Sequence, residues 1–161
     1  MVVTTPQKPE SVKSPKVISS RRYARQLALQ QLFQWEFDQN QSRGLEESKA
    51  GRSTAPEVRD FADHIVQGVL THHQELDQLI NLYAEEWTID RMPVVDRNIL
   101  RWAIFELLWI PDIPAKVTLN EAIELAKRFA DDEARRFING LLDHLLRDEP
   151  RLQSKRADLT S

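Results

Sequence analysis

The segment PVVDRNILRWAIFELLWIPDIP spans residues 93–114 and carries a helical pattern with a defined start and end. Pro93 can occupy the first turn of a helix, whereas Pro111 cannot continue one and marks its end. The apolar residues between them recur at helical spacing: Val95, Ile99, Trp102, Ala103, Leu107 and Leu108. The segment therefore predicts one helix bounded by two prolines, followed by a rigid elbow at residues 111–114.

The sequence on both sides repeats this pattern and has few alternating β-branched runs, which argues against a sheet. Further helices are predicted from 19–20 to about 40, from Pro56 to about 70, from about 73 to 83, from 116 to 130, and from a cap at Asp131 or Asp132 to about 148. Six or seven helices with short connections predict an all-α fold. The connection at 87–92 favours two three-helix subdomains packed together.

The two ends of the chain differ from this helical body. Residues 1–18 contain three prolines and scattered lysines, so we expect a disordered basic leader. Residues 19–148 form the predicted helical domain, and the polar remainder, 149–161, is expected to be frayed. Gly140 interrupts the last predicted helix at a cost of about 1 kcal/mol relative to alanine. We interpret it as a position where another helix or a ligand approaches the backbone, the alternative being a tolerated imperfection.

The residue composition of the chain and its lack of catalytic motifs argue against an enzyme. The chain has no cysteine, which removes disulfides, thiolate metal sites and thiol nucleophiles. It also lacks a glycine-rich phosphate loop, a G-x-S-x-G elbow and an H-E-x-x-H pair. We expect the four histidines to be surface or boundary residues, and we expect no catalytic residue, metal or cofactor. Without a long apolar run or a secretory signal, the chain is expected to be cytoplasmic and free of the membrane.

Charge is distributed unevenly along the chain. The first 25 residues hold six basic side chains and one acidic one, a net charge of +5, whereas the whole chain carries −3, which leaves −8 for the other 136 residues. A basic arm of this kind suits a polyanion, and the acidic body suits a basic protein partner. A leader that only keeps the chain soluble would give the same pattern.

The start of the first predicted helix offers a candidate RNA surface. Arg21 and Arg25 lie four residues apart with Arg22 beside them, an arrangement that can follow a phosphate backbone. Gln30 lies on the same polar face. Phe33 is on roughly the same side and can offer a base a stacking surface of about 1 to 3 kcal/mol. The alternative for Phe33 is a place in the core, as expected for Trp35 and Phe37.

Several strings stand at a specific mutual spacing. In the C-terminal half they are VDRNILR at 95–101, PDIP at 111–114, NEAIELAKRF at 120–129 and RFINGLLD at 136–143. In the first predicted helix they are RRYAR at 21–25, ALQ at 28–30 and LFQW at 32–35. Together they resemble the NusB family of transcription antitermination factors over about residues 20–147. The leader is longer than is usual in that family, and ADDE at 130–133 replaces a segment that usually starts with glycine.

The resemblance implies an all-α RNA-binding protein of two three-helix subdomains, without catalytic residues or a cofactor. Members of the family pair with NusE, a small-subunit ribosomal protein. The heterodimer recognises the boxA element of nascent ribosomal RNA and joins an RNA polymerase complex that resists termination. The resemblance also places the residues of the RNA surface: Arg21, Arg22, Arg25, Phe33, Arg136 and Phe137.

Two further residues are expected to contact partners. Asp96 corresponds to an acidic residue at the NusE interface of the family, where it can meet a basic side chain. Trp109 occupies a position that usually holds a smaller or polar residue, and we expect it to be exposed at a partner surface. Self-association into a homodimer stays open. Two other functions also stay open: an accessory domain related to ribosomal RNA cytosine methyltransferases, and a pure protein adaptor.

Overall fold

The computed structural model describes residues 15–40, 55–85, 87–157 and 159. This part of the chain contains no strand, which confirms the predicted all-α class. Its helices are α1 (Pro15–Asn40), α2 (Pro56–Thr71), α3 (His73–Tyr83), α4 (Val94–Trp109), α5 (Ala115–Phe129), α6 (Asp132–Asp148) and α7 (Gln153–Ala157), with 3₁₀ turns η2 (Ile89–Arg91) and η3 (Pro150–Leu152). None of the helices in these ranges is long and apolar enough to cross a membrane.

The predicted starts and ends of the middle helices are close to those observed, because local signals set them. Pro56 begins α2, and Pro93 directly precedes α4, which ends two residues before Pro111. Asp131 is the N-cap of α6, where its side chain accepts a hydrogen bond of 2.7 Å from the backbone N–H of Ala134.

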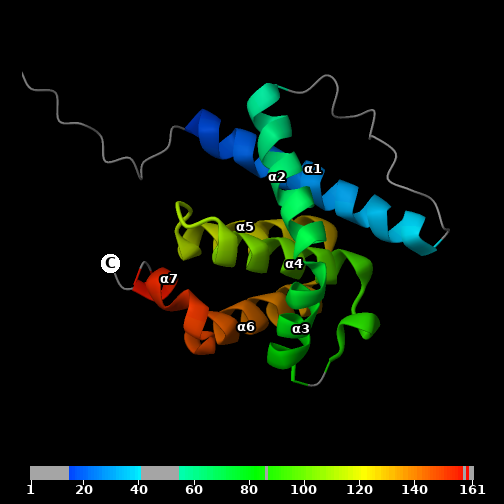
Figure 1. Ribbon diagram of the computed structural model, residues 1–161, viewed down its shortest axis with the longest axis vertical. Coiled ribbons are helices and arrows are strands. Elements are labelled where there is room, and N and C mark those ends of the chain that lie inside the picture. The colour runs from blue at the N-terminus through cyan, green and yellow to red at the C-terminus, as the bar shows by residue number, and fades with distance from the viewer. Residues whose placement is uncertain (1–14, 41–54, 86, 158, 160–161) are drawn as a thin grey trace, which may run out of the picture.

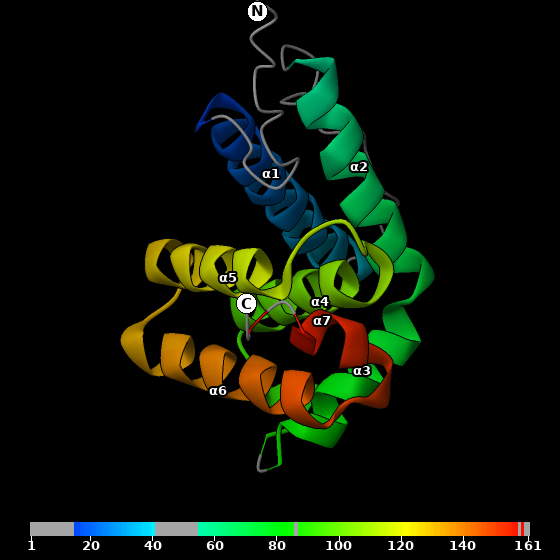
Figure 2. The same ribbon diagram turned by 90° about the vertical axis from the view of Figure 1, so that its left-hand side faces the viewer.

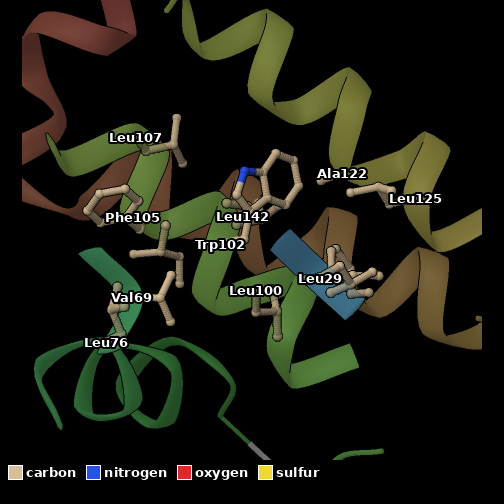
Figure 3. Packing of buried hydrophobic residues seen from close by; sticks show 14 of the residues in the cluster. Leu29, Val69, Leu76, Leu100, Trp102, Phe105, Leu107, Ala122, Leu125 and Leu142 are labelled. Carbon is tan, nitrogen blue, oxygen red and sulfur yellow. The ribbon is translucent and has the colours of Figure 1, made fainter. Parts of the chain in front are cut away.

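Helix α4 lies at the centre of the molecule, between α1 and α2 on one side and α5 and α6 on the other (Figures 1 and 2). Eleven of its 16 residues are buried. Figure 3 shows Trp102 and Leu100 of α4 among side chains from the other helices, including Leu29 of α1 and Leu125 of α5. These side chains belong to one continuous hydrophobic cluster. The connection expected at 87–92 is present as η2 and its flanks, but the two halves of the chain share a single core.

The ends of the described chain are more ordered than the sequence predicts. Helix α1 begins at Pro15, so residues 15–18 of the expected leader are helical; residues 1–14 lie outside the described part. The expected fraying of 149–161 is wrong for 149–157, which form η3 and α7. Leu152 is buried in the core cluster, and Lys155 Nζ donates to the carbonyl groups of Ile110, at 2.8 Å, and Ile113. This segment therefore closes over the elbow after α4.

A buried ionic cluster holds α1 against α4 and α5. Arg25 is only 3% exposed, and its guanidinium donates to both carboxylate oxygens of Glu106, at 3.0 Å and 2.6 Å. The same carboxylate accepts hydrogen bonds from Trp102 Nε1 at 2.7 Å and Thr118 Oγ1 at 3.1 Å. The expectation that Arg25 contacts RNA phosphates is therefore wrong. Its charge is used to compensate a carboxylate that has lost all contact with water.

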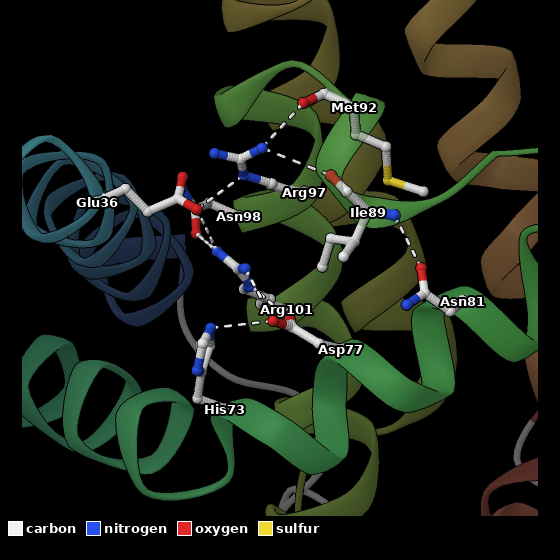
Figure 4. A network of polar contacts seen from close by, with 9 residues as sticks. All are labelled: Glu36, His73, Asp77, Asn81, Ile89, Met92, Arg97, Asn98 and Arg101. Carbon is white, nitrogen blue, oxygen red and sulfur yellow. Dashed lines mark hydrogen bonds and ion pairs between the residues drawn. The ribbon is translucent and has the colours of Figure 1, made fainter. Parts of the chain in front are cut away.

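A second polar network fixes the other end of α1 (Figure 4). Glu36 of α1 accepts hydrogen bonds from Arg97 at 2.7 Å, Asn98 at 3.0 Å and Arg101 at 2.8 Å. Arg101 continues the network to α3 through two bonds to Asp77. Arg97, Asn98 and Arg101 of the string VDRNILR therefore hold α1, α3 and α4 together, and α1 cannot rotate about its own axis without breaking one of the two networks.

The close helix approach expected at Gly140 occurs at Gly68 instead. A Cβ atom added to Gly140 would meet no atom within 4 Å, because this position faces solvent. A Cβ atom added to Gly68 would lie 2.0 Å from the Phe105 ring, closer than any real contact. Only glycine at position 68 lets α2 pack against the buried ring of α4.

Replacing Arg25 with methionine should reduce the free energy of unfolding by about 3 to 5 kcal/mol, because Glu106 would remain buried without its cation. The control is Arg147→Met. Arg147 is exposed and pairs with the exposed Asp143 at the surface, so we expect a change of about 0 to 1 kcal/mol. Urea unfolding of both variants measures these changes. Equal losses of stability would contradict the claim that the buried ionic cluster holds α1 in place.

The two glycines provide a second test of the packing. Gly140→Ala should increase the free energy of unfolding by up to about 1 kcal/mol through helix propensity alone. Gly68→Ala should decrease it by about 1 to 3 kcal/mol, because the Phe105 ring must move. Thermal unfolding of the two variants gives the signs, and a destabilised Gly140→Ala protein would show that this face of α6 packs against something.

Candidate nucleic-acid and partner interface

The three arginines at the start of α1 differ in burial and in their partners. The guanidinium of Arg21 lies over the ring of Phe61 on α2, 4.4 Å from its centroid. Arg25 is buried against α4, and Arg22 pairs with Glu121 on α5. Burial and then the charge of Arg25 lower the pKa of Arg21. Arg21 and Arg25 share the face toward Phe61, as expected, but Arg25 is buried there and Arg22 turns to α5, so the three do not form one exposed phosphate-binding surface.

Arg22 is the one of the three that presents its charge to solvent. Its Nε and Nη2 atoms donate to the two oxygens of Glu121 at 3.0 Å and 2.9 Å, and its side chain is 46% exposed. The hydrogen bonds to Glu121 raise the pKa of Arg22. Among the described residues nothing accepts a hydrogen bond from Nη1, so this nitrogen is available to an anion from outside.

Helix α1 also exposes a stripe of aromatic rings. Phe33 is 45% exposed, and Tyr23 and Phe37 are exposed to a similar extent. The interpretation of Phe33 as a core residue is thus wrong, and so is that of Phe37. At 100° per residue these rings share one face of α1 with Gln30, which is also exposed. The seven-residue spacing from Tyr23 to Gln30 to Phe37 is the sequence signal that could have revealed this face.

Asp96, in the first turn of α4, is a largely buried residue whose carboxylate has no hydrogen-bonding partner in the described part of the chain and keeps some contact with solvent. Its side chain is 6% exposed, yet no described residue donates a hydrogen bond to it or forms an ion pair with it. Burial and then the nearby charge of Asp131 raise the pKa of Asp96. A carboxylate in this state can be stabilised by a cation that comes from another molecule.

The remaining predicted residues lie on other surfaces. Arg136 is exposed on α6, and the ring of Phe137 lies 6.3 Å from that of Trp87, which is itself exposed. Helices α4 and α5 lie between α6 and α1, so the α6 pair forms a separate surface (Figure 2). The expectation of an exposed Trp109 is wrong, because its ring stacks on His72 at 3.8 Å.

The four histidines lie at surface or boundary positions, as expected: His64 is exposed, and the other three are partly exposed. His72 and His64 both contact the Phe105 ring, while His73 and His144 face carboxylates. Within the described ranges no three histidine, aspartate or glutamate side chains are grouped in a way that could hold a metal ion.

The chain is similar to known proteins of one family. The model of the NusB family matches residues 22–147. The transcription antitermination protein NusB of Trichlorobacter lovleyi is 45% identical over 126 residues, which cover 78% of this chain and 89% of that protein. The protein of the same name from Myxococcus xanthus is 43% identical over 133 residues, covering 80% of this chain and 95% of the relative.

Solved structures lead to the same family. The structure of T. maritima NusB superposes with a TM-score of 0.74 at 32% identity, covering 93% of this chain and 100% of the other. A structure of the antitermination factors NusB and NusE in complex with dsRNA has a TM-score of 0.70 at 24% identity, covers 80% of this chain and 97% of the other, and supports the fold alone. With the family model matching most of its length, this chain belongs to the NusB family.

Proposed function

We propose that this protein is a transcription antitermination factor. In this role it binds boxA-type single-stranded RNA of nascent ribosomal RNA together with NusE and supports ribosomal RNA transcription as part of an RNA polymerase complex. It works in the cytoplasm by binding alone, without catalysis or a cofactor. The observation that carries the proposal is the family match over residues 22–147, together with curated relatives named as antitermination proteins.

The RNA surface proposed here is smaller on α1 than the sequence suggests. Arg22 supplies an exposed cation, and Gln30 and Phe33 lie on the same open side of the helix. Arg25 is excluded by burial, and Arg21 contributes only from its partly buried place over Phe61. Arg136 and Phe137 on α6 form a second contact region, which a strand can reach after passing the intervening helices.

The NusE surface centres on Asp96. The partner is a ribosomal protein, and such proteins carry the basic side chains that an unpaired carboxylate requires. Binding would supply the cation that this largely buried carboxylate lacks in the described part of the chain, and would offset the unfavourable effect of its partial burial on the charge. A pure protein adaptor would use the same contact without RNA, so the two functions differ in whether RNA binds at all.

Phe33→Ala should weaken binding of boxA RNA, measured by gel shift in the presence of NusE, by about 1 to 3 kcal/mol, or roughly 5- to 150-fold. Its stability should change little because the ring is already half exposed. Leu82→Ala, which truncates an even more exposed side chain on α3, is the control. An unchanged affinity would remove Phe33 from the surface. Failure of the unaltered protein to bind the RNA while it binds NusE would favour the adaptor.

Asp96→Asn should have opposite effects on stability and on NusE binding. The pKa of Asp96 is raised in the folded state, so above that pKa the ionised carboxylate lowers the free energy of unfolding. Below about pH 4 the group is protonated in both the folded and the unfolded state, and this loss of stability disappears. The variant should therefore be more stable than the original at pH 7, with a gain that vanishes toward low pH.

The same variant should bind NusE more weakly, by about 2 kcal/mol or more, because the partner's cation loses its counter-charge. Urea unfolding at pH 7 and pH 4 and titration calorimetry with NusE measure the two effects. Asp90→Asn, in the exposed turn η2, serves as the control. An Asp96→Asn protein that binds NusE as tightly as the original would place the interface elsewhere.

A further inference from the structure

A pocket with a cavity volume of about 220 Å³ opens between α1 and α5. Arg22 and Gln26 line it from α1, and Glu121, Glu124, Lys127 and Arg128 line it from α5. Figure 2 shows α5 lying across α1 on this side of the molecule. The pocket has about the volume of seven water molecules in the liquid, which leaves room for a small charged group.

The positive charges of this pocket are better placed for a ligand than its negative ones. Glu121 is nearly buried and fully occupied by Arg22, whose guanidinium remains open to solvent. Glu124 and Lys127 form a surface pair at 3.5 Å with both side chains about half exposed, a contact that is weak and easily exchanged.

Arg128 is the least constrained cation of this pocket. It forms no ion pair in the described part of the chain, and its guanidinium lies 5.5 Å from the ring of the neighbouring Phe129. An anion that enters the pocket can therefore bind Arg128, which has no ion pair among the described residues, and Lys127, whose pair with Glu124 is weak. It can also contact the exposed edge of the Arg22 guanidinium. Counted together with the two carboxylates, the pocket carries a net charge of +1.

We propose that this pocket binds a phosphate group of the RNA strand, with Lys127 and Arg128 as phosphate contacts beside Arg22. A phosphate diester is compact and accepts several hydrogen bonds at once, which suits cations that converge from two helices. The proposal rests on the proposed RNA-binding function and adds a defined subsite on α5 to it.

The position of the pocket favours a nucleic acid over an acidic protein segment. Gln26 of the pocket, Gln30 and Phe33 follow one another on the same face of α1, at spacings of four and three residues. At 1.5 Å per residue, Phe33 lies about 10 Å along the helix from Gln26. A strand whose phosphate occupies the pocket can thus place a nearby base against an exposed ring. An acidic peptide would gain nothing comparable from that ring.

The test is the salt dependence of RNA affinity for Lys127→Ala, Arg128→Ala and the double variant, each assembled with NusE and measured by fluorescence anisotropy on boxA RNA. The pocket holds one phosphate, and loss of one phosphate contact on a single strand should reduce the slope of log affinity against log salt by about 0.7. The double variant should therefore lose about 0.7 from the slope, bind about 5-fold more weakly at 0.1 M salt, and approach the original protein toward 1 M.

The control is the double variant Lys116→Ala, Arg147→Ala, which changes the net charge equally. Lys116 is exposed on α5 outside the pocket, and Arg147 is exposed on α6. A slope and affinity for the pocket variant equal to those of this control would overturn the proposal, even if Arg22→Glu still abolished RNA binding. A loss confined to NusE affinity would also overturn it and assign the pocket to a protein. If the unaltered protein bound no RNA, the proposed function itself would fail.

Discussion

The carboxylate of Glu106 sets the geometry on which the rest of the molecule depends. It lies in the last turn of the central helix with no access to water, and it is tolerable there only because four hydrogen bonds from three helices reach it. These donors are held on α1, α4 and α5, so their meeting point fixes where those helices cross. The exposed face of α1 is therefore a consequence of which face the buried cluster requires.

Helix α4 holds a second buried carboxylate in the opposite condition. Asp96 is largely buried, but, unlike Glu106, its carboxylate has no donor among the described residues and keeps some contact with solvent; burial and a neighbouring carboxylate raise its pKa. The contrast separates a structural charge from a functional one on the same helix. A satisfied carboxylate stabilises the fold, while an unsatisfied one lowers stability and creates a preference for a basic partner.

Local features of the chain could be predicted, and features that depend on distant residues could not. Prolines and the Asp131 cap determine helix ends through their immediate neighbours, so those ends were close to the prediction. Arg25 looked like a phosphate contact because the residue that buries it lies 81 positions away. The tail at 149–157 looked frayed because it is polar, and its order comes from bonds between Lys155 and carbonyl groups more than 40 residues earlier. Lys127 and Arg128 line a pocket only because α1 packs beside α5, and the sequence carries no local signal for that contact.

The contact between Lys155 and the elbow has a consequence for how the chain is completed during synthesis. The elbow at 111–114 is made early in the second half of the chain, but the side chain that satisfies the carbonyl groups of Ile110 and Ile113 comes 42 to 45 residues later. Because translation proceeds from the N-terminus, those carbonyl groups stay hydrated while α5 and α6 are being made. These two carbonyl groups can exchange water for the Lys155 side chain only after the end of the chain has been made. Their shielding is therefore a late step in the biogenesis of the protein.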